Sequence, residues 1–172
     1  MDTDKIIEDS INSLHKTLYT AWLVIFILMI VTIGIHYIVY GIFKGQERFS
    51  FPYNNLKYIF FILVFLAVII CLYIRKLHFP RQMARLLKDW NKNQPKIFPY
   101  SEILEKYSIN VILSIILTEN PIALGFIFSL VTGNVILFYI SIIVSISLLI
   151  YCIPKKSEIK TLLNIHNQRR SL

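Results

Sequence analysis

The sequence is poor in the residues from which metal centres and catalytic sites are built. It contains two cysteines and four histidines, and these are scattered along the 172-residue chain. Two cysteines without clustered histidines make no metal or haem motif. A glycine-rich phosphate loop, an HExxH helix and a Ser/His/Asp or Cys/His set of motif spacing are also absent. We therefore expect neither an enzyme nor a protein that holds a cofactor or metal.

Charged residues are nearly absent from the long apolar runs of the sequence. Hydrophobic residues make up 56% of the chain and the mean hydropathy is +0.61. Four runs approach or exceed the ~18–20 residues that span hydrocarbon, namely residues 18–43, 58–74, 109–131 and 135–153. Three of these runs contain no acidic residue. The pattern predicts an all-α, polytopic membrane protein in which residues 1–172 form one domain with four transmembrane helices.

The basic residues are distributed unevenly between the segments that join these runs. With four spans, fifteen of the eighteen Lys and Arg residues fall on one side of the membrane and three on the other. The positive-inside rule then predicts that both termini and the central segment are cytoplasmic. This asymmetry favours attraction to anionic lipid over nucleic-acid binding. We expect a multi-pass protein of a prokaryotic inner or plasma membrane whose first span is retained as an anchor.

One cytoplasmic segment is predicted to meet the lipid headgroups. Residues 80–92 carry an apolar stripe on one face, which is typical of a helix lying in the membrane interface. The candidate headgroup contacts on its other face are Arg81, Arg85, Lys88 and Lys92. A cytoplasmic helix packed on protein is the alternative. Residues 154–172 form a basic tail, and residues 3–17 have helical spacing that either continues into the first span or bends along the membrane.

The third apolar run contains the only carboxylate within a predicted span. Glu119 is followed by Asn120 and Pro121, and Ser114 and Thr118 precede it at one-turn spacing. Pro121 has no N–H and Asn120 is a favoured N-cap, so the run predicts a helix that stops and restarts with Asn120 as its cap. Such breaks near the bilayer centre mark ion or substrate sites in many transporters.

Two interpretations of this break remain open. In one, Glu119 binds a proton or cation with help from Ser114, Thr118 and Asn120. In the other, a neutral Glu119 hydrogen-bonds a neighbouring helix and the break is structural. His36 is the other ionisable group within a span, and we expect it at the outer interface, bonded to water or a neighbouring side chain rather than to Glu119.

Residues Thr118–Leu130 resemble the ion-binding helix of rotary ATPase proteolipid (c-type) subunits. Glu119 is followed by small and apolar residues and by Gly125 six positions later. The resemblance implies that Glu119 is a proton or sodium carrier in a ring. The hairpin of the third and fourth spans also resembles uncharacterised small four-span prokaryotic membrane proteins, a likeness that implies no function.

The remaining polar residues of the spans predict packing. Cys71 and Cys152 are expected to be small apolar packing residues near the cytoplasmic ends, without a disulfide. Ser141 and Ser145 lie one turn apart and should let helices approach and bond across an interface. The sequence therefore favours a small accessory or structural membrane subunit in a homo- or hetero-oligomer, acting through helix packing and a basic cytoplasmic face. The alternative is a proton- or cation-translocating component that uses Glu119.

Overall fold

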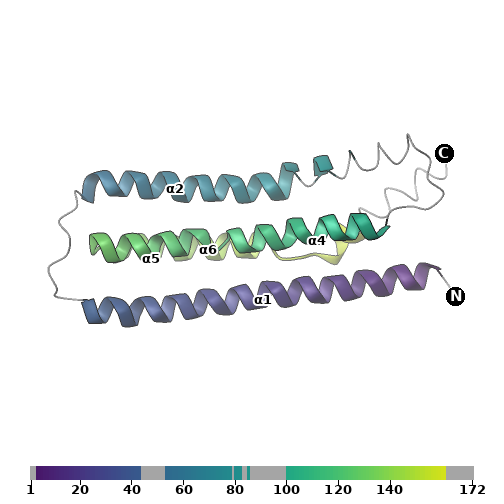
Figure 1. Cartoon of the computed structure of the whole chain (residues 1–172), viewed down its shortest axis with the longest axis horizontal. Coiled ribbons are helices and arrows are strands. Elements are labelled where there is room, and N and C mark those ends of the chain that lie inside the picture. The colour runs from purple at the N-terminus through teal and green to yellow at the C-terminus, as the bar shows by residue number, and fades with distance from the viewer. Residues whose placement is uncertain (1–2, 44–52, 79, 83–84, 86–99, 162–172) are drawn as a thin grey trace.

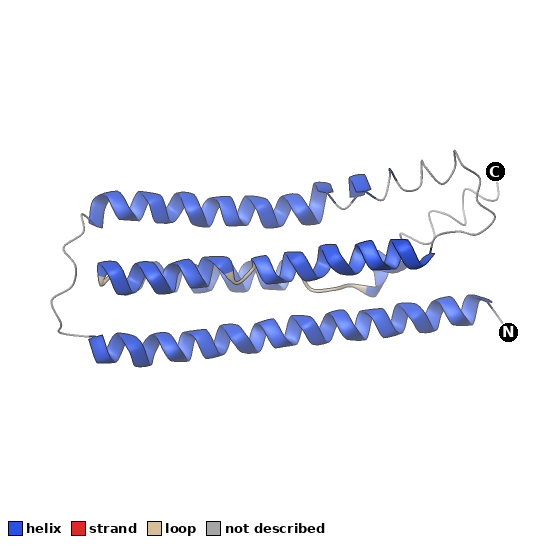
Figure 2. Ribbon diagram, in the orientation of Figure 1, coloured by secondary structure: helices blue, strands red, loops and turns tan. Residues whose placement is uncertain are grey.

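The computed structural model describes residues 3–43, 53–78, 80–82, 85 and 100–161. Every regular element in these ranges is a helix (Figure 2). Three of the helices are long and apolar enough to cross a membrane. They run side by side along the long axis of the molecule (Figure 1). The expectation of an all-α protein with membrane-spanning helices is confirmed at this level.

Helix α1 (Thr3–Phe43) is one continuous helix of 41 residues. At 1.5 Å per residue it is about 60 Å long, roughly twice the thickness of a hydrocarbon core. The predicted N-terminal segment and first span are therefore a single helix, and the alternative of a bend is wrong. Ile11 and Leu18 in its first half are buried. The indole Nε1 of Trp22 donates a hydrogen bond of 2.9 Å to the carbonyl of Leu149.

Helix α2 (Tyr53–Tyr73) begins five residues earlier than the predicted span and passes directly into a π-helical turn, η1 (Ile74–His78). A π-helical turn inserts an extra residue per turn and redirects the side chains that it carries. Arg75 lies in this turn. The sequence contains no proline or glycine there, so the turn was not predicted.

The third apolar run forms two helices, α4 (Tyr100–Leu117) and α5 (Asn120–Thr132). Gly133 then adopts a left-handed conformation at φ 72°, and the Asn134 side chain accepts a hydrogen bond from the backbone N–H of Ile136. This is the C-cap and N-cap chemistry of a tight helix connection. Helix α6 (Val135–Tyr151) returns antiparallel to α5, which confirms the predicted hairpin.

The helices enclose two hydrophobic clusters. The larger one joins residues 11–29 of α1 to α4, the end of α2 and the end of α6, and includes Leu18, Tyr107 and Leu149. The smaller one joins α2, α5 and α6 around Phe60, Val64 and Leu137. After α6 the chain forms a short helix over residues 156–161, where Lys160 lies 3.4 Å from Glu8 of α1. Helix α6 ends at Tyr151, two residues before the end of the predicted fourth span, 135–153.

Candidate functional site

The break in the third apolar helix lies at Thr118 and Glu119, which form a turn between α4 and α5. The backbone N–H groups of both residues make i−3 hydrogen bonds, at 3.1 Å from Thr118 to Ile115 and 3.2 Å from Glu119 to Ile116. The predicted stop and restart is therefore confirmed. The predicted cap is wrong by one residue. Glu119 occupies the N-cap position without a side-chain capping bond, and Asn120 is the first residue of α5.

The two hydroxyls near the break bond to carbonyls of their own helix. Ser114 donates to the carbonyl of Asn110 at 2.7 Å, and Thr118 donates to the carbonyl of Ile115 at 2.6 Å. Both side chains are completely buried. Neither hydroxyl donates to Glu119 or to the carbonyl of Leu117, the group that loses its usual donor at Pro121. The predicted cluster of Ser114, Thr118, Glu119 and Asn120 is close in sequence, but these bonds do not join it into one site.

Glu119 and Asn120 instead lie at the surface of the helix bundle. Glu119 is half-buried and Asn120 is exposed. Asn120 continues a row of exposed apolar side chains at helical spacing, formed by Ile109, Ile112, Leu113, Ile116, Ala123 and Ile127. We call this row with Asn120 the α4–α5 outer face. No hydrogen bond or ion pair joins the side chain of Glu119 or Asn120 to another residue in the described ranges.

A second buried polar contact joins α1 to α5. His36 is completely buried, its Nε2 lies 2.6 Å from the hydroxyl of Ser129, and its ring stacks on Phe138. Ser129 donates its own proton to the carbonyl of Phe126 at 2.9 Å, so His36 Nε2 carries the hydrogen in this arrangement. Nδ1 then has no partner among the described residues.

This arrangement confirms that His36 bonds a neighbouring side chain rather than Glu119, and the partner is Ser129. Side chains of α5 and α6 cover its ring, and its place at the outer membrane interface stays a prediction. Ser129 was not among the candidate residues. A polar residue on each of two apolar runs was a signal that could have suggested the pair, but the sequence does not give the relative depth of the two helices.

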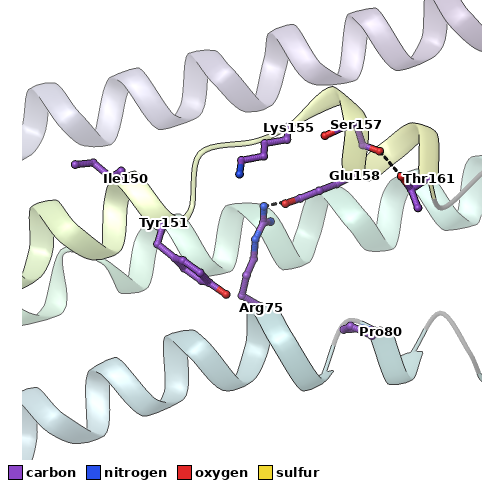
Figure 3. A pocket seen from close by; sticks show the side chains of 8 residues that line it. All are labelled: Arg75, Pro80, Ile150, Tyr151, Lys155, Ser157, Glu158 and Thr161. Atoms are coloured by element: carbon purple, nitrogen blue, oxygen red, sulfur yellow. Dashed lines mark hydrogen bonds and ion pairs between the residues drawn. The ribbon is translucent and has the colours of Figure 1, made fainter.

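A third polar group lies at the opposite end of the bundle, where η1 meets the chain after α6. The Nη2 of Arg75 lies 2.6 Å from the Glu158 carboxylate, and the Tyr107 hydroxyl donates to the same oxygen at 3.1 Å. Arg75 and Glu158 border a cavity of about 480 Å³ (Figure 3). The sequence analysis missed this cluster because its members come from three separate segments.

The predicted headgroup contacts are described only in part. Arg81 and Arg85 are exposed, and residues 80–82 are helical. Lys88 and Lys92 lie outside the described residues. Whether residues 80–92 form an amphipathic helix therefore stays a prediction.

The two cysteines pack against each other. Both are completely buried and unoxidised, with their sulfur atoms 3.7 Å apart. The prediction that they are packing residues is consistent with their place in the larger hydrophobic cluster. Within the described ranges, no group of three or more His, Cys, Asp or Glu side chains is arranged to hold a metal ion.

Comparisons of the chain with protein families, curated protein sequences and solved structures give no match. The interpretation of these sites therefore depends on their geometry.

Proposed function

We propose that the protein is a small integral membrane subunit that assembles through the α4–α5 outer face. The observation that carries this proposal is the exposed Asn120 in the middle of an otherwise apolar row. An amide that faces hydrocarbon without a hydrogen-bond partner is costly, and a neighbouring helix relieves that cost. Glu119, which is half-buried, precedes Asn120 in the chain. Its carboxyl group adds a second polar group whose exposure to hydrocarbon a neighbouring helix would relieve.

A second copy of the chain is the partner that this chemistry fits best. An amide donates hydrogen bonds and a carboxyl group accepts them. Two copies related by a two-fold axis would pair Asn120 of each copy with Glu119 of the other, which satisfies both groups in one self-complementary interface. The small side chain of Ala123, on the same row, lets two backbones approach.

The proposed topology has four spans with both termini in the cytoplasm. Exposed tyrosines near both ends of the apolar helices support spanning by α1, α2 and α6, because tyrosine favours both membrane interfaces. They are Tyr19 and Tyr37 on α1, Tyr58 and Tyr73 on α2, and Tyr139 and Tyr151 on α6. Tyr19 and Tyr37 are about 27 Å apart along α1 at 1.5 Å per residue, which is close to the hydrocarbon thickness. The exposed Arg81 and Arg85 would then belong to a basic cytoplasmic face.

The interface is tested by Asn120→Leu, with Ser147→Ala as the control. Ser147 is also exposed, but it lies on α6 and donates its hydroxyl to its own helix at Ile143. We expect Asn120→Leu to weaken self-association in lipid vesicles about three- to thirtyfold, the range of one interhelical hydrogen bond. Energy transfer between labelled copies, diluted with lipid, measures this. A monomeric wild-type protein, or equal effects of both variants, would contradict a homo-oligomer held by this face.

Proton or cation translocation by Glu119 is the alternative function. Glu119 is half-buried at the surface of the bundle, which favours access from outside the single chain. Ser114 and Thr118 donate their hydroxyl protons to backbone carbonyls, so neither donates to the Glu119 carboxyl. Proton flux into vesicles distinguishes the two functions. We expect no flux from the wild-type protein, and a flux that Glu119→Gln abolishes would favour translocation.

A further inference from the structure

The cavity beside Arg75 lies where two apolar helices end. Arg75 enters it from η1, Lys155 from the chain after α6, and Glu158 from the short helix over residues 156–161 (Figure 3). Its volume of about 480 Å³ is that of a small-molecule site. It is independent of the α4–α5 outer face, since no residue of α4 or α5 lines it.

The side chain of Arg75 is largely buried and is held in one orientation by Glu158. Its side chain is only 10% exposed, and the Glu158 carboxylate that it contacts at 2.6 Å also accepts a hydrogen bond from the buried Tyr107. A guanidinium carries five N–H donors in a planar fork, and one carboxylate oxygen cannot engage them all. The Tyr107–Glu158 pair therefore fixes the orientation of the guanidinium and leaves it able to bind a second anion.

The side chains that line the cavity carry a net positive charge, which favours binding of an anion. Two cations, Arg75 and Lys155, face a single carboxylate, Glu158. Lys155 is exposed and takes part in no ion pair within the described ranges. A phosphate group would balance the excess positive charge and match the planar donor fork of arginine.

The apolar side of the cavity indicates where that phosphate comes from. Ile150 and Tyr151, the last residues of α6, line the cavity and are 60% and 39% exposed. Ile143 and Ile146 continue the exposed apolar surface of Ile150 along α6 at helical spacing. A lipid with its phosphate in the cavity would place its acyl chains along this apolar surface. A free phosphate has no apolar group that could contact it. Basic pockets between membrane helices bind anionic headgroups in this way.

We propose that this cavity is a binding site for one anionic phospholipid, with the lipid phosphate between Arg75 and Lys155 and the acyl chains along α6. Such a site is distinct from general attraction of a basic surface to a charged membrane, because it is saturable and depends on position. Arg75 and Lys155 should matter, and equally charged neighbours should not.

The test compares Lys155→Gln with Lys156→Gln in the purified full-length protein. The two lysines are adjacent and both exposed, but only Lys155 lines the cavity, so the two variants lose the same charge at different places. Native mass spectrometry in nonionic detergent counts bound lipids during titration with phosphatidylglycerol. Phosphatidylcholine of equal chain length serves as the uncharged comparison. We expect the wild-type protein to bind one phosphatidylglycerol preferentially, and Lys155→Gln to weaken this about fivefold.

Lys156→Gln should change the affinity less than twofold, within the range of a screened surface charge. Arg75→Lys keeps the charge but not the donor fork, and we expect it to weaken binding while the protein still folds, as judged by its thermal transition. Equal losses from Lys155→Gln and Lys156→Gln would overturn the site in favour of a general surface effect. The lipid would be overturned as the occupant by a different result. In that result, millimolar inorganic phosphate competes for the site, and the protein shows no preference for phosphatidylglycerol over phosphatidylcholine.

Discussion

At the residue scale, the absence of a side chain at Gly125 lets α5 and α6 approach closely. A Cβ at this position would collide with the side chain of Ser141 and lie 3.2 Å from the Cα of Phe138. Ser141 is completely buried and donates its hydroxyl to Leu137 in its own helix. The hydroxyl of Ser145 has no partner among the described residues. Ser141 thus lies where α5 and α6 approach closely, as predicted, but in the described residues neither serine makes the predicted bond between helices. Gly125 therefore has a structural role in the packing of α5 on α6, and this role does not depend on its resemblance to the glycine of proteolipid subunits.

We expect Gly125→Ala to destabilise the protein by about 1–3 kcal/mol, because the buried contact is overpacked. Gly41→Ala is the matched control, since nothing lies within 4 Å of a Cβ there and alanine favours helix formation. Thermal unfolding in detergent, followed by tryptophan fluorescence, measures both changes. Adding Ser141→Gly to Gly125→Ala should recover part of the loss. A Gly125→Ala variant as stable as Gly41→Ala would contradict the close approach of α5 and α6.

At the scale of the elements, the contact between α2 and the end of α6 is set by Cys71 and Cys152. Their sulfur atoms are 3.7 Å apart in the hydrophobic cluster, so a small shift brings them to disulfide distance, about 2 Å. We expect iodine, a membrane-permeant oxidant, to convert the two thiols to a disulfide within one chain while it is reduced to iodide. Intact mass should fall by two hydrogen atoms, without a covalent dimer. Cys71→Ser should abolish this change, and a covalent dimer from wild-type protein would place the two thiols on different copies.

The sequence predicted those elements whose cause is local. Apolar length predicted the spanning helices, Pro121 predicted the break, and the Thr132–Asn134 connection predicted the hairpin. Contacts between distant segments were not predictable. The depth of α1 relative to α5 decides that His36 meets Ser129, and the π-helical turn η1 decides that Arg75 meets Glu158. Periodicity fixes which side of a helix is apolar, but not how far one helix slides along another.

At the scale of the whole molecule, the described helices place polar chemistry at three levels. The Arg75 cavity lies where α2 and α6 end, and the His36–Ser129 pair joins the second halves of α1 and α5. The break at Glu119 lies between them along the path of α4 and α5. In the proposed topology, the lipid site would be at the cytoplasmic boundary and the interface for assembly would be at mid-depth. The two proposals can therefore fail separately.

This arrangement depends on the orientation of the bundle, which single cysteines can test. Asn55, in the first turn of α2, and Glu105, in the first half of α4, are both exposed and lie near opposite ends of the bundle. The native Cys71 and Cys152 are completely buried, so the wild-type protein should react little with a membrane-impermeant maleimide. In intact cells we expect the reagent to label Asn55→Cys, because three basic residues on that side and fifteen on the other orient it outward. Glu105→Cys should react only after the membrane is opened. The reverse pattern would show that the topology is inverted and that the Arg75 cavity lies at the outer leaflet. Labelling of both positions in intact cells would place both on the outer side, which excludes an odd number of membrane crossings between residues 55 and 105.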